Sequence, residues 1–66
     1  MRLVELASIL PGYVILNIHT KEEAWPSMPA GMVFSEEIFE NALVINANPY
    51  GTYTMEVFIK FEEESK

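Results

Sequence analysis

The chain has 66 residues, contains no cysteine, and carries a formal net charge of −6, from ten glutamates against four lysine and arginine residues. These values exclude a disulfide framework and thiolate metal sites, and they oppose direct binding to nucleic acid, which depends largely on lysine and arginine. Half of the residues are hydrophobic, more than a disordered segment would contain. A domain this small buries only about 60% of its unfolded surface, so we expect a second copy or another partner to cover the remaining apolar surface.

The first predicted element is a short amphipathic helix over residues 2–10. Leu3, Leu6 and Leu10 recur at three- and four-residue spacings, and Pro11 ends the pattern. A helix of this length does not persist alone. We therefore expect its leucine stripe to pack on a sheet.

Residues 13–19 (YVILNIH) are rich in β-branched and aromatic types, which predicts a strand. The first half of this segment is apolar on both faces, as is typical of a central strand. Its far end is expected to reach solvent near Asn17 and His19.

Residues 20–30 are predicted to form a surface loop, because Pro26 and Pro29 preclude a regular helix or a central strand. This loop carries Trp25 and Met28. Two interpretations of Trp25 stay open: it contacts a partner from a proline-stiffened loop, or it folds back as a lid over one end of the core.

Residues 31–34 predict a brief strand. Ser35 then has the chemistry of a helix N-cap, since acidic residues follow it directly. We expect a helical turn over residues 36–41 that places Ile38 and Phe39 inward.

The last third of the chain predicts an antiparallel hairpin, with strands at 42–47 and 53–61 joined by a proline–glycine turn at 48–51. Strand 53–61 alternates with a period of two, which predicts one buried face formed by Tyr53, Met55, Val57, Ile59 and Phe61. The sum is an α+β fold: a short N-terminal helix packed on a small, mainly antiparallel sheet, with a second helical turn near 36–41. We expect one domain over residues 1–61 and an acidic tail over 62–66.

Histidine and glutamate supply the main candidates for catalysis or metal binding. His19 is the single histidine, and no second ligand stands at a metal-binding spacing from it. Glu36 and Glu40 are four residues apart, where a solvated helix start is a simpler explanation than a cation site. The serines lack a G-x-S-x-G context, and the glycines form no phosphate-binding loop. We therefore expect no enzyme activity, no metal and no cofactor.

Aromatic side chains outside the predicted core give a better indication of function, because such side chains anchor protein partners or stack on flat ligands. Phe58 is the clearest case, since it points away from the buried face of its strand. The alternative is that these rings close a minor core or a dimer interface. The predicted partner or ligand contacts are Trp25, Met28, Tyr50, Tyr53 and Phe58.

The pattern E-L-x-x-x-L-P at Glu5, Leu6, Leu10 and Pro11, followed by the strand V-I-L-N-I, resembles a loose class of short phage and prophage proteins that share no defined activity. The resemblance covers residues 3–18 in pattern and most of the chain in element order. It implies a helix, a strand, a variable loop and a closing hairpin. It assigns no functional residue.

These observations predict a small cytoplasmic interaction protein that self-associates and binds or inhibits a host protein. No apolar run approaches the roughly 18 residues of a membrane span. An alternative prediction is a protein that sequesters a small nucleotide signal between aromatic rings at an oligomer interface, although few cations are present to hold phosphates.

Overall fold

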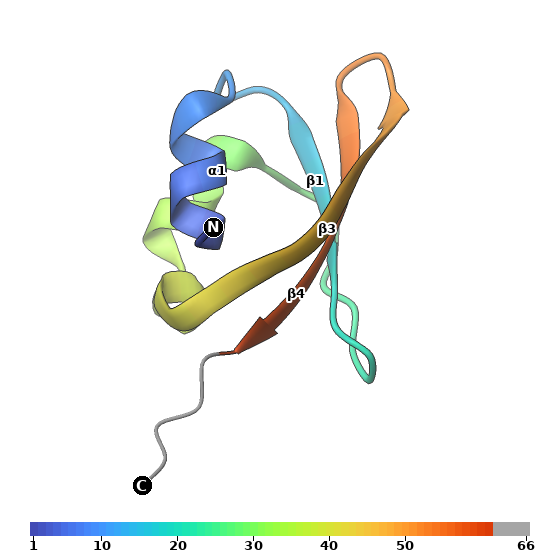
Figure 1. Cartoon of the computed structure of the whole chain (residues 1–66). Coiled ribbons are helices and arrows are strands. Elements are labelled where there is room, and N and C mark those ends of the chain that lie inside the picture. Colours follow the sequence, from blue (N-terminus) through green and yellow to red (C-terminus); the bar gives the residue numbers. More distant parts are fainter. Residues whose placement is uncertain (62–66) are drawn as a thin grey trace, which may run out of the picture.

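The structure is a computed structural model that describes residues 1–61, and the predicted acidic tail over 62–66 lies outside this range. A helical layer covers one face of a four-stranded sheet (Figure 1). This arrangement confirms the predicted α+β fold. The elements in chain order are α1 (Leu3–Ile9), β1 (Ile15–His19), β2 (Met28–Pro29), the 3-10 helices η1 (Ala30–Ser35) and η2 (Glu37–Asn41), β3 (Ala42–Gly51) and β4 (Thr54–Phe61).

The strands lie in the order β2-β1-β4-β3. β1 pairs in parallel with β4, while the β1/β2 and β3/β4 pairs are antiparallel. The sheet is therefore mixed, and β1 is an inner strand, as its apolar start predicts. Within residues 1–61, no helix reaches the length and apolar character that a membrane span requires.

The core lies between the helical layer and the inner face of the sheet. From β4 this face contributes Val57 and Ile59, which confirms the period-two prediction for the middle of that strand. Tyr53 does not belong to the buried set, because it precedes β4 in the connecting turn and is exposed. The fully buried large side chains are Phe39, Leu3, Leu16, Ile18, Ile59, Val33 and Val57.

The predicted strand at 31–34 is wrong, because these residues belong to η1. Pro29, the last residue of β2, is the N-cap of η1 and still has an extended backbone, with φ −66° and ψ 148°. Ala30 and Val33 are both fully buried. Their spacing of three residues matches one turn of a 3-10 helix, so the segment buries one narrow face rather than alternate residues.

The predicted helical turn exists as η2, but two details of it are wrong. The Ser35 hydroxyl donates to the Met32 carbonyl oxygen at 2.8 Å and so closes η1, while Glu36 occupies the cap position of η2. Ile38 is 51% exposed, whereas Phe39 is fully buried. Neighbouring residues of a 3-10 helix point about 120° apart, so the core can receive only one of them.

The predicted turn at 48–51 is also wrong. β3 continues to Gly51, and the connection to β4 is Thr52 and Tyr53. Pro49 is tolerated because β3 is an edge strand, and the register shifts by one residue between Pro49 and Gly51.

Candidate partner-binding surfaces

The helical layer leaves the opposite side of the sheet uncovered (Figure 1). We call this side the outer face. The register places Phe58 on it, between His19 of β1 and Asn46 of β3. Its residues on β1, β3 and β4 are Ile15, Asn17, His19, Leu43, Asn46, Asn48, Thr54, Glu56, Phe58 and Lys60.

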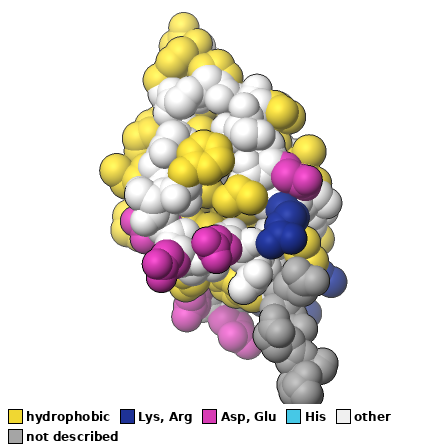
Figure 2. Space-filling view, turned by 90° about the vertical axis from the view of Figure 1, so that its left-hand side faces the viewer, with side chains coloured by type: hydrophobic (Ala, Val, Ile, Leu, Met, Phe, Trp, Pro, Cys, Tyr) yellow, Lys and Arg dark blue, Asp and Glu magenta, His cyan; other side chains and the backbone are white. Residues whose placement is uncertain are grey.

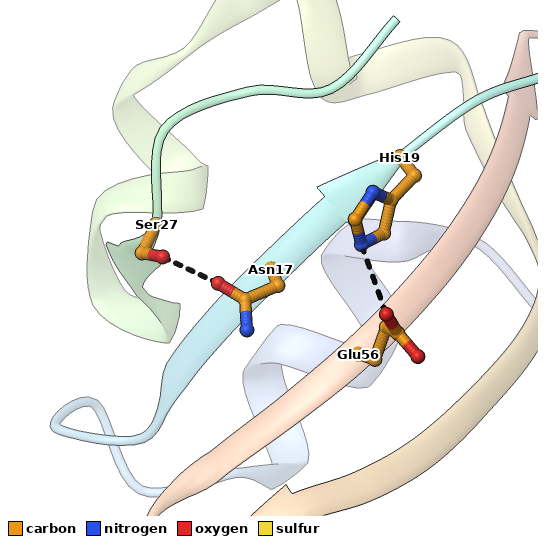
Figure 3. Close-up of polar contacts among 4 residues, drawn as sticks. All are labelled: Asn17, His19, Ser27 and Glu56. Atoms are coloured by element: carbon orange, nitrogen blue, oxygen red, sulfur yellow. Dashed lines mark hydrogen bonds and ion pairs between the residues drawn. The ribbon is translucent and has the colours of Figure 1, made fainter.

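Phe58 is held in place by its neighbours on the outer face. Its ring stacks on the His19 ring, with centroids 4.9 Å apart and planes inclined by 22°. The His19 Nε2 atom lies 3.4 Å from Glu56 Oε2, close enough for an ion pair but without hydrogen-bond geometry (Figure 3). On the adjoining part of β1, the Ser27 hydroxyl donates to the Asn17 side-chain oxygen. Phe58 is therefore a half-buried aromatic ring with little freedom to move.

Two of the predicted contact residues belong to the interior. Met28 is 8% exposed and pairs with Leu16 in the β1/β2 ladder. Trp25 is half-buried and packs edge-on against Phe39 and Phe61, with ring centroids 5.4 and 6.0 Å away. Trp25 is thus a lid on the core, the second of the two alternatives for this residue. Met28 presents no free apolar surface, and Trp25 exposes only part of its ring.

The other two predicted contacts lie near the tip of the β3/β4 hairpin, away from Phe58. Tyr50 and Tyr53 are exposed. Tyr53 makes an edge-to-face contact with Tyr13 at 5.4 Å between centroids, because the parallel strands β1 and β4 begin side by side. The structure therefore divides the predicted contact set among the core, the hairpin tip and the outer face.

An open groove of about 720 Å³ lies beyond the end of β1, where β4 continues past its pairing partner. A second hollow of about 450 Å³ adjoins it and includes Phe58. Lys21 and Lys60 line the larger groove, together with Thr20, Glu22, Glu23, Ile45, Ile59 and Phe61. The sequence did not indicate this groove, because it arises from the unequal lengths of two paired strands.

The helical layer presents a second surface, which we call the helical face: the exposed side of α1, η1 and η2. Its exposed large apolar side chains are Ile9, Met32, Phe34 and Ile38. Its charged side chains are Glu5, Glu36, Glu37 and Glu40. Figure 2 looks toward this side and shows hydrophobic groups over its centre, acidic groups toward its lower end, and a basic group on the right beside the hydrophobic centre. The sequence reasoning missed this surface because it placed Phe34 in a strand and Ile38 in the core.

Arg2 is the N-cap residue of α1 and borders this surface. Its Nη2 atom donates to the Glu40 carbonyl oxygen at 2.7 Å, and its backbone N–H donates to Glu5 Oε1 at 2.8 Å. The elements α1, η1 and η2 contain no lysine or arginine. The helical face is therefore mainly acidic and apolar, with the positive charge of Arg2 at its border.

No protein-family model matches the chain, and no curated protein or solved structure is significantly similar to it. Among residues 1–61, no three histidine or glutamate side chains gather in a way that could hold a metal ion.

Proposed function

We propose that this chain is a small cytoplasmic interaction protein without enzymatic activity, which self-associates and binds a protein partner that has a basic surface. The observation that carries the proposal is the separation of charge between two faces. The helical face has four glutamates and four exposed apolar side chains, and its helices contain no lysine or arginine. A phage-encoded inhibitor that covers a nucleic-acid-binding groove on a host protein would need such a surface.

The two components of the helical face have different roles in this proposal. Complementary charge raises the rate of encounter and selects against acidic partners. Apolar groups such as Phe34 and Ile38 supply the desolvated centre from which most binding energy comes. A partner with basic residues around an apolar depression fits both requirements.

Reversal of charge on the helical face is expected to reduce partner binding. We predict that the double variant Glu36→Lys/Glu37→Lys captures at least about tenfold less of its partner from bacterial lysate, since attraction at the rim becomes repulsion. The measurement is quantitative mass spectrometry of the captured proteins at low and at high salt. The partner bound by the wild type should decrease as salt screens the charges.

Glu22→Lys/Glu23→Lys is the matched control, because it changes the net charge equally on an exposed loop outside the helical face. It should retain the partner. Equal loss of partner capture in both double variants would mean that the net charge, and not the helical face, determines binding. Full capture by both would remove the helical face as the binding surface.

The groove favours a second candidate function, the sequestration of a small nucleotide. Lys21 and Lys60 line it, and the adjoining hollow offers the Phe58 ring for stacking. Glu22 and Glu23 also line the groove and oppose an anionic ligand, which is why we rank this function second.

A thermal-shift screen over nucleotides tests the second candidate. A hundredfold excess over Kd adds about 2.7 kcal/mol to the free energy of unfolding, which raises Tm by roughly 10 °C or more in a domain of this size. Lys21→Glu should abolish that shift, whereas Glu5→Lys, on α1, should leave it unchanged. If no nucleotide shifts the wild-type Tm, the candidate is removed.

A further inference from the structure

The outer face differs from the rest of the surface in its charge. Glu56 and Lys60 are the only acidic or basic residues in the four strands, apart from His19, and they have opposite signs. Phe58 lies midway between them on β4. Apart from His19, which lies 3.4 Å from Glu56, the remaining polar side chains of the outer face are neutral amides and a threonine. In a chain of net charge −6, this is a surface where two copies can approach without opposing like charges.

We infer that the outer face binds a second copy of the chain in a sheet-on-sheet dimer, with a two-fold axis that passes beside Phe58. This inference deepens the self-association in the proposed function by giving it a surface and a geometry. It does not depend on the partner of the helical face.

The spacing along β4 makes the outer face self-complementary. Glu56 and Lys60 each lie two residues from Phe58, roughly 7 Å along the strand in opposite directions. A two-fold axis that lies between the two sheets beside Phe58 and runs perpendicular to β4 reverses the direction of the second β4, so each Glu56 meets a Lys60 of the other copy. One operation thus forms two opposite-charge pairs around a central pair of phenylalanine rings.

Face-to-face packing of two sheets suits these side chains. Sheets pack about 10 Å apart, with strand directions within about 30° of each other. Over about 7 Å of strand that angle displaces the charged groups by only a few ångströms, within the reach of glutamate and lysine. The stack with His19 already restricts Phe58, so little side-chain entropy is lost when the two faces meet.

The alternative occupant of the outer face is a different protein. A basic partner has a stronger attraction to the four glutamates of the helical face than to the balanced pair on β4. An acidic partner would be repelled by the chain as a whole. A second copy is the occupant that matches the alternation of charge around Phe58.

Charge exchange across the axis provides the test. Glu56→Lys places two lysines of one copy opposite two of the other, and Lys60→Glu does the same with glutamates. Each single variant should raise the dimer dissociation constant at least about tenfold. The double variant Glu56→Lys/Lys60→Glu restores both pairs and has the net charge of the wild type. Its dissociation constant should return to within about threefold of the wild-type value.

Mixing the two single variants gives an independent readout. A heterodimer of Glu56→Lys with Lys60→Glu has two attractive pairs, so the mixture should form dimers at concentrations where each variant alone is monomeric. Sedimentation velocity measures mass, and circular dichroism confirms that each variant is folded. A variant that does not fold is replaced by the neutral form Glu56→Gln or Lys60→Gln, which should weaken the dimer less than charge reversal does.

A wild-type chain that stays monomeric at all accessible concentrations would overturn the inference. Weakened single variants without rescue by the double variant or by mixing would overturn the axis at Phe58. Capture of the basic partner is measured on the same variants, so loss of the dimer with retained capture separates this inference from the proposed partner binding.

Discussion

Phe39→Ala is expected to lower the free energy of unfolding by about 3–5 kcal/mol, the range observed when a buried phenylalanine is truncated. Phe39 is fully buried where η2 meets the core, and the Trp25 ring packs edge-on against it. The whole domain is stabilised by only about 0.05–0.15 kcal/mol per residue. Loss of this one side chain should therefore remove a large fraction of the stability of a 66-residue chain and lower its Tm by more than about 12 °C.

Urea denaturation measures this loss. Trp25 is the single tryptophan, so its emission reports the contact with Phe39 directly, while far-ultraviolet circular dichroism reports the sheet. Ile38→Ala is the matched control on the neighbouring residue, which is 51% exposed and should cost less than about 1 kcal/mol. Equal destabilisation by both variants would mean that η2 presents a different side to the core.

Three elements could be predicted from sequence because each has a clear local residue pattern. The leucine spacing of α1 and the alternation of β4 both follow one period over most of their length. β1 was identified by its β-branched residues, and its inner position by apolar residues on both faces. In these segments, the secondary structure that the local residue pattern favours is also the one that buries the apolar side chains in the core.

The predictions from sequence were wrong where tertiary packing interrupts the regular spacing of buried residues. β3 contains an extra residue near Ile45, which shifts its register against β4 and interrupts the alternation of faces. η1 and η2 follow a period of three over only one or two turns, too short to separate from a strand or a helix start. Because of these errors, Phe34 was predicted in a strand and Ile38 in the core, whereas the structure exposes both on the helical face.

The candidate surfaces were only partly predictable for a related reason. Phe58 was identified as an outward residue because the parity of β4 alone determines its face. The burial of Met28 depends on pairing with Leu16, twelve residues earlier in the chain, and the lid position of Trp25 depends on Phe39 and Phe61. A proline-rich loop has no periodicity from which such distant contacts can be inferred.

Phe58→Glu is expected to abolish self-association and leave the fold intact. A glutamate at this position would face its own copy across the two-fold axis and lie two residues from Glu56, so four carboxylates would gather where two rings packed. Loss of a central aromatic anchor together with this repulsion should raise the dimer dissociation constant at least about 100-fold. The fold should lose only about 1 kcal/mol, since Phe58 is half-buried and its ring stacks on the ring of His19.

Phe34→Glu is the matched control, because it makes the same chemical change on the opposite side of the molecule, at an exposed residue of η1. Both variants have the same net charge, so a general effect of added charge would weaken the dimer equally. Sedimentation velocity on the two variants should find monomers for Phe58→Glu and dimers for Phe34→Glu. The reverse result would place self-association on the helical face and overturn the dimer axis beside Phe58.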